Sequence, residues 1–156
     1  MTDPGWPYNL PIWRRRYEAP SPDRQLVARI DPALEVAMSA PTLGTLCVSS
    51  KLHIERCNPS FVWSDDSRFL AVPQYFLKFG WLRRQRLLII AFHEGHVYAS
   101  RASTRYFQPE SFIERRLVVS LNPARSSRRI EFDMDSDLRT AFRTYRRARW
   151  AELPLN

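Results

Sequence analysis

The sequence predicts a mainly β fold of antiparallel sheets with blade-like repeats, either an incomplete propeller or a sandwich, plus one C-terminal α-helix. The first observation behind this prediction is a repeat, because residues 21–28 are echoed by residues 64–71 at an offset of 43 residues. One propeller blade takes roughly 40–45 residues. The second is composition, since the aromatic content of 13% suits a β-rich core in which flat rings pack on pleated strands.

The two copies share the pattern Ser-x-Asp-x-(Gln/Arg)-(Leu/Phe)-(Val/Leu)-Ala, which is a polar turn followed by an apolar strand. Ser21 and Asp23 fill the polar positions of the first copy, and Ser64 and Asp66 fill those of the second. Serine and aspartate side chains hydrogen-bond backbone amides in tight turns. We therefore expect both copies to form a turn that leads into a sheet.

Residues 58–72 resemble the WD40-like, TolB-type β-propeller repeat, and residues 21–28 resemble it more weakly. The matching positions are Pro59, Trp63, Ser64, Asp66, Leu70 and Ala71. Asp65 and Ser67 stand where the family has Pro and Gly, and Arg24 occupies the Gly position of the first copy. A closed propeller has at least about four blades, too many for a chain of this length. The resemblance implies two blade-like sheets in one β fold, or an assembly completed by a second chain.

The chain divides into an N-terminal arm, 1–20, rich in proline and aromatic residues, and one β-rich domain, 21–156. Pro4, Pro7, Pro11 and Pro20 exclude a helix in the arm because proline fixes φ and removes a donor. The longest apolar run, 87–92, is too short to span a bilayer, and no secretory signal opens the chain. We therefore expect a cytoplasmic protein with no membrane partner.

Strands are expected in chain order wherever apolar residues run between turn signals. The expected strands are 26–30, 33–38, 43–48, 52–56, 60–63, 69–74, 87–92, 96–101, 113–121 and 128–134. The turn 49–51 pairs Val48 with Leu52 and places Cys47 opposite His53. Pro73 predicts that the strand 69–74 ends there or lies at an edge, followed by a linker at 75–81. The unbroken run 87–92 predicts a strand buried on both faces.

The C-terminal helix is expected at about 136–151. Ser136 or Asp135 can cap its start. Leu138, Phe142 and Tyr145 recur at helical spacing and predict an apolar stripe. Arginines cover the opposite face.

The residue patterns give no catalytic or metal site, and we expect no cofactor and no enzyme activity. His93 and His96 would flank a hairpin turn, and two histidines are too few for zinc. Cys47 and His53 would form a cross-strand pair without an orienting third group. The chain has only four glycines, too few for a phosphate-binding loop.

Charge points to the second half of the chain as the binding surface. Residues 1–75 carry 8 basic and 8 acidic side chains, whereas residues 76–156 carry 16 basic and 8 acidic ones. Such asymmetry indicates an acidic partner. The candidate partner-binding residues are Trp81, Arg83, Arg84, Arg139, Arg143, Arg146 and Arg147.

Function therefore remains open between two classes. The first is a non-catalytic protein-binding module for an acidic protein, for example an adaptor or a bacterial immunity protein that neutralises a toxin. The second is a nucleic-acid-binding protein, because arginine contacts phosphates and stacks on bases. A homo-oligomer also stays open.

Overall fold

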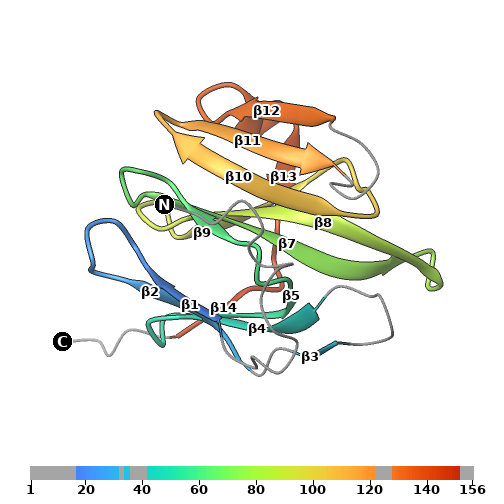
Figure 1. The fold of residues 1–156 in the computed structure, drawn as a ribbon, viewed down its shortest axis with the longest axis horizontal. Coiled ribbons are helices and arrows are strands. Elements are labelled where there is room, and N and C mark those ends of the chain that lie inside the picture. Colours follow the sequence, from blue (N-terminus) through green and yellow to red (C-terminus); the bar gives the residue numbers. More distant parts are fainter. Residues whose placement is uncertain (1–16, 32–33, 36–41, 122–127, 152–156) are drawn as a thin grey trace.

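The computed structural model describes residues 17–31, 34–35, 42–121 and 128–151, and its strands lie in three layers (Figure 1). The larger sheet has the order β1-β2-β4-β5-β7-β8-β9-β13. Its strands are β1 (Tyr17–Pro20), β2 (Val27–Ile30), β4 (Thr42–Val48), β5 (Leu52–Cys57), β7 (Phe69–Lys78), β8 (Leu82–Ala91), β9 (His96–Ser100) and β13 (Phe142–Thr144).

Three short strands pair off the main path of this sheet. They are β3 (Leu34–Glu35) on β4, β6 (Val62–Trp63) on β7 and β14 (Arg149–Trp150) on β5. The smaller sheet has the order β10 (Phe107–Ile113), β11 (Arg116–Leu121) and β12 (Arg129–Asp133). The described pairs are antiparallel, which confirms the predicted mainly β fold class.

Strands β7 and β8 belong to the middle layer and have a hydrophobic core on each side (Figure 1). The first core lies against β1, β2, β4 and β5, and its buried residues include Leu46, Ile54, Leu70, Val72, Leu88 and Ile90. The second core lies against the smaller sheet, and its buried residues include Phe69, Ala71, Leu87, Ile89, Phe112 and Leu117. Neighbouring residues of β7 and β8 thus enter opposite cores, which confirms the expected burial on both faces for residues 87–91, whereas Phe92 lies in the turn and is partly buried.

The two sequence copies form the same turn, atom for atom. In the first, the Ser21 hydroxyl donates to Asp23 Oδ1 at 2.6 Å and accepts from the Leu26 amide at 3.0 Å. In the second, the Ser64 hydroxyl donates to Asp66 Oδ1 at 2.7 Å and accepts from the Phe69 amide at 2.9 Å. The expected turn-to-sheet role of both copies is confirmed.

Both turns need one residue in the left-handed region, at the position where the propeller family has glycine. Arg24 has φ of 61° and Ser67 has φ of 62°. The two turns also touch, because the Asp23 amide donates to the Ser67 hydroxyl at 2.9 Å. The described strands form open sheets, and membership of the propeller family stays a prediction.

The predicted register of the 43–56 hairpin is confirmed near its turn, but it shifts between Gly44 and Leu46, so the expected pairing of Thr45 with Glu55 is not formed. Val48 pairs with Leu52, Leu46 with Ile54, and Cys47 with His53. Ser49 and Ser50 both have positive φ, which gives this tight turn the twist that antiparallel strands require.

Two expectations for the middle of the chain are wrong. β7 does not end at Pro73 but continues to Lys78, so residues 75–78 are strand and not linker. Pro73 has no amide hydrogen, but its carbonyl accepts from the Asn58 amide at 2.9 Å. The expected strand 113–121 is broken by a turn at Glu114 and Arg115, both with positive φ, and β10 before it was not expected.

The helix begins where expected but is much shorter. It spans Asp137–Thr140 only, instead of about 136–151, and the following residues form β13 and β14. β13 covers the edge of β9, where Phe142 pairs with Ser100 and is buried in the second core. Tyr145 packs against the first core. The stability gained by pairing β13 with β9, and by packing Phe142 and Tyr145 against different cores, therefore outweighs the local helix propensity.

The predicted N-terminal arm, 1–20, lies only partly within the described residues. Its last residues, Tyr17–Pro20, form β1 and belong to the sheet, so the domain begins earlier than residue 21. Residues 1–16 lie outside the described part of the chain, as does most of the expected strand 33–38. No helix of the described chain is both long and apolar enough to cross a membrane.

Candidate functional site

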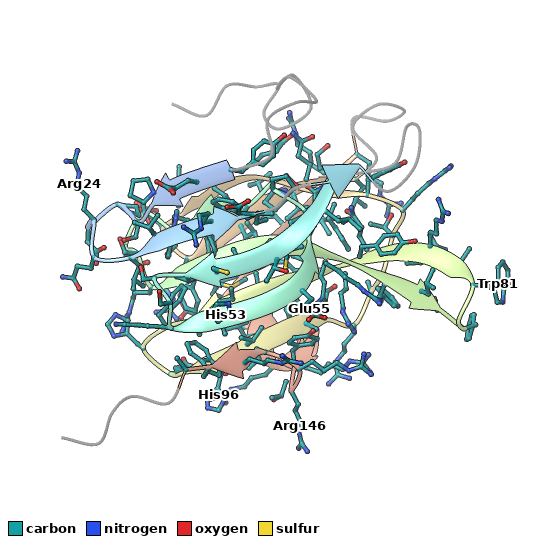
Figure 2. All side chains as sticks on the ribbon, turned by 90° about the horizontal axis from the view of Figure 1, so that it is seen from below. Arg24, His53, Glu55, Trp81, His96 and Arg146 are labelled. Carbon is teal, nitrogen blue, oxygen red and sulfur yellow. The ribbon has the colours of Figure 1, made fainter. Side chains whose placement is uncertain are left out.

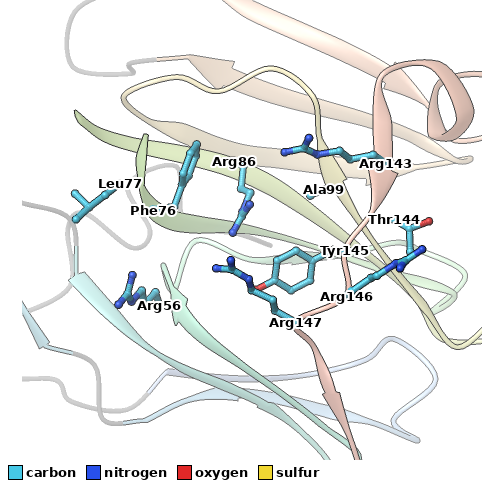
Figure 3. A pocket seen from close by; sticks show the side chains of 10 residues that line it. All are labelled: Arg56, Phe76, Leu77, Arg86, Ala99, Arg143, Thr144, Tyr145, Arg146 and Arg147. Carbon is cyan, nitrogen blue, oxygen red and sulfur yellow. The ribbon is translucent and has the colours of Figure 1, made fainter. Parts of the chain in front are cut away.

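A groove lies between β5, the outer part of β7 and β8, and the segment that joins β13 to β14 (Figure 3). Two overlapping cavities, of about 520 Å³ and about 720 Å³, form it. Both cavities are lined by Arg56, Phe76, Arg86, Tyr145, Arg146 and Arg147, and Arg143 lines the smaller cavity alone. We name the groove that these residues line the arginine groove.

Arg86 forms the base of the arginine groove and is held from three sides. Its guanidinium carbon lies 4.8 Å from the centre of the Phe76 ring and 5.0 Å from that of the Tyr145 ring. Its Nε donates to Gln74 Oε1 at 2.7 Å. The amide nitrogen of the buried Gln74 in turn donates to the Tyr145 hydroxyl at 2.8 Å and to the Glu55 carbonyl at 2.9 Å. The position of this cation is therefore fixed before any ligand arrives.

The charge around Arg86 is strongly positive. Figure 3 shows the guanidinium groups of Arg56, Arg143 and Arg147 around the opening, whereas Arg146 is directed away from Arg86. Burial is the largest cause that lowers the pKa of Arg86, and the positive charges of Arg147 and Arg143 lower it further. The mutual repulsion of these cations favours an anion between them.

Within the described ranges of the chain, no ion pair neutralises these cations. Glu55 is the one acidic side chain among the described residues that line the two cavities. The ion pairs within the described chain lie elsewhere, for example Arg115 with Asp135 at 2.9 Å and Arg129 with Glu110 at 2.8 Å. The arginine groove can therefore bind carboxylates or phosphates through charge-assisted hydrogen bonds.

The structure brings together only part of the predicted set of binding residues. Arg143, Arg146 and Arg147 line the groove, but Arg143 lies in β13 and the other two lie in the segment between β13 and β14, not on a helix. Arg139 is exposed on the short helix and is not among the lining residues. Trp81 lies at the far end of the β7–β8 hairpin, well away from Arg146 (Figure 2). Arg83 and Arg84 are not among the lining residues, although they pair with Leu77 and Phe76, which are.

Sequence reasoning missed the base of the groove. Arg56 and Arg86 are far apart in sequence. Each directly precedes a buried stretch of the chain, which begins at Cys57 and at Leu87 respectively. Helical spacing predicts Tyr145 on the apolar stripe of a helix, but its ring covers Arg86 instead. Arg84 and Arg86 stand at alternate positions just before the apolar run 87–92. This pattern is the one local signal in the sequence that points to the base of the groove.

The histidine turn differs from the expected geometry. His96 pairs with Ala91 across the turn, so His93 lies within the turn and is not its cross-strand partner. The Tyr98 hydroxyl donates to Glu94 at 2.8 Å, and burial and this hydrogen bond raise the pKa of Tyr98. No group of three metal-binding side chains occurs in the described ranges of the chain.

Cys47 and His53 do form the predicted pair, with 3.2 Å between Sγ and Nδ1. The neighbour of His53 on its other side is Arg149, through the β14–β5 pairing. A catalytic imidazole is oriented by a carboxylate or amide that accepts its second proton. The imidazole hydrogen bond that the described part of the chain gives His53 is the one with Cys47, and no carboxylate or amide accepts from it there.

We expect the two free thiols to react very differently. Cys57 is fully buried and burial raises the pKa of its thiol, whereas Cys47 is partly exposed. Because the thiolate is the reactive form, iodoacetamide should modify Cys47 alone in the folded protein and both residues after denaturation. Intact-mass and peptide mass spectrometry give the count and the position. Equal labelling of Cys57 in the folded protein would contradict the buried placement of β5.

Comparison with protein-family models, with curated proteins and with solved structures gives no match to this chain.

Proposed function

We propose that this protein is a non-catalytic binding module whose arginine groove holds an acidic segment of a protein partner. The observation that carries the proposal is Arg86, a cation held between two rings in a cavity that Arg56, Arg143 and Arg147 also line. A preorganised arginine loses little conformational freedom on binding, and arginine is a frequent hot spot of interfaces.

The occupied ring faces favour a carboxylate-bearing segment over a nucleic acid. Single-stranded nucleic acid binds through aromatic side chains on which bases stack. Here Phe76 and Tyr145 both use a ring face for Arg86. An adaptor, or an immunity protein that blocks an acidic toxin surface, would use such a groove.

The test compares two charge-reversal variants with equal net charge. The groove variant is Arg143→Glu with Arg147→Glu, and the matched control is Arg24→Glu with Arg139→Glu, all exposed positions. Binding of fluorescent poly-glutamate is measured by anisotropy at about 150 mM salt, where distant charges are screened. We expect the groove variant to lose about 2 kcal/mol or more of binding free energy and the control to lose much less.

Wild type, the groove variant and the control are also titrated with random single-stranded and duplex nucleic acid. Sub-micromolar nucleic-acid binding that depends on the groove, together with no response to poly-glutamate, would move the assignment to the nucleic-acid class. Equal weakening in the groove variant and the control would contradict a defined site. Affinity capture with both variants then identifies the natural partner as the protein that the control retains and the groove variant loses.

A further inference from the structure

The β7–β8 hairpin extends beyond the rest of its sheet as a two-stranded ribbon. Beyond the Tyr75–Gln85 pair, the described strand pairs of this hairpin join β7 only to β8, up to Lys78 with Leu82. Figure 2 shows the ribbon projecting from the body with Trp81 at its end. We name residues 77–84 the ribbon tip.

The ribbon tip exposes large apolar side chains. Phe79 is 79% exposed and Trp81 is 72% exposed, and Leu77, which also lines the smaller groove cavity, is 43% exposed. Phe79 also has φ of 57°, a left-handed conformation that is a genuine outlier for a bulky residue. Placing a phenylalanine beside Gly80 in this turn therefore costs stability, and the exposed ring contributes nothing to either core.

The charge of the ribbon tip is entirely positive. Lys78, Arg83 and Arg84 flank the aromatic residues, and the stretch 67–93 contains no aspartate or glutamate. Aromatic rings at a convex end with cations just behind them suit the interface of an anionic bilayer. Tryptophan and phenylalanine settle at the headgroup level, and lysine and arginine extend toward lipid phosphates.

We propose that the ribbon tip inserts into the surface of an anionic lipid bilayer and attaches the protein to it peripherally. The expectation of no membrane partner was based on spanning segments, and surface attachment requires none. A protein interface buries about 800 Å² on each side, more than three side chains at a convex tip supply. A bilayer needs no matching pocket. The proposal goes beyond the arginine groove and is tested with a different probe and different variants.

The probe is a set of vesicles of phosphatidylcholine with phosphatidylserine, in a ratio of about 7 to 3, with phosphatidylcholine alone as the comparison. Binding is measured by flotation, and insertion of Trp81 by quenching of its emission with brominated lipid. We expect wild type to bind the anionic vesicles. Phe79→Ser and Trp81→Ser should each weaken binding roughly tenfold. Each variant removes one ring that the bilayer would bury and leaves every charge in place.

The matched control is Ile113→Ser. Ile113 is 58% exposed at the end of β10, next to Glu114 and far from the ribbon in sequence, so its replacement should leave vesicle binding unchanged. Phe79→Gly provides a second, structural control, because glycine adopts positive φ without strain. This variant should melt no lower than wild type and still bind vesicles roughly tenfold more weakly.

Three results would overturn the proposal. Wild type that stays unbound with anionic vesicles at physiological salt excludes the attachment. Equal binding by wild type, Phe79→Ser and Trp81→Ser means that only surface charge is attracted to lipid. A dimer of wild type in light scattering that Trp81→Ser converts to a monomer, without vesicle binding, assigns the tip to a contact between two copies of the chain.

Discussion

Replacing Trp63 by alanine is expected to lower the free energy of unfolding by about 3–5 kcal/mol. Trp63 is 9% exposed and belongs to the first core. Its ring stacks on Phe92 with 5.4 Å between ring centres, and its Nε1 donates to the Ala19 carbonyl at 3.1 Å. Alanine would leave a cavity and would remove the hydrogen bond that joins Trp63 to β1.

Chemical denaturation followed by far-UV circular dichroism measures this loss. Trp81→Ala is the matched control, since it removes the same side chain from a position that is 72% exposed. It should change the free energy of unfolding by no more than about 0.5 kcal/mol. If both variants unfold at nearly the same denaturant concentration as wild type, the placement of Trp63 in the first core is wrong.

Replacing Phe112 by alanine is expected to have a comparable effect, about 3–5 kcal/mol, through the second core. Phe112 is 2% exposed and stacks on Phe69 with 5.7 Å between ring centres. The backbone around it joins the two sheets, because its carbonyl accepts from the Asp65 amide at 3.0 Å. Loss of the ring should detach the smaller sheet from β7.

Hydrogen exchange distinguishes this local effect from a general one. In Phe112→Ala, amides of β11 should exchange faster than amides of β4, since β4 contributes to the first core only. The neighbouring replacement Ile113→Ala, at an exposed position, should leave both the free energy of unfolding and the exchange pattern close to wild type. Uniformly faster exchange in Phe112→Ala would contradict two separate cores.

The two cores also explain how the arginine groove keeps its shape. Arg86 lies directly before Leu87 and Leu88, which enter the second and first cores respectively. Tyr145, which covers the guanidinium of Arg86, follows β13, and β13 is fixed to β9 by backbone pairing. The strands that position these cations are therefore stabilised by the two hydrophobic cores and not by contacts within the groove.

Local chemistry made the two repeated turns and the 43–56 hairpin predictable. In each, the interactions that define the structure join residues at most a few positions apart, such as Ser64 with Asp66 and Val48 with Leu52. Serine, aspartate and short polar turns have strong intrinsic preferences, so the pattern of residue types is sufficient.

Local chemistry failed at the C-terminus because two different long-range contacts compete there with a helix. Helical spacing would place Leu138, Phe142 and Tyr145 on one stripe. In the structure, Phe142 enters the second core and Tyr145 packs on the first. One helical face cannot serve two cores on opposite sides of a sheet, so the helix ends at Thr140 and β13 begins at Phe142.

The sequence by itself determined the β class, the repeated turns and the basic character of the second half. Only the tertiary structure decided which cations meet. Arg56, Arg86 and Arg147 come from β5, β8 and the segment before β14, and no spacing in the chain relates them. Turn preferences act over a few residues and are written in local sequence. The groove depends on how β5, β8 and the C-terminal segment pack around the first core, and that arrangement is set by long-range pairing and burial.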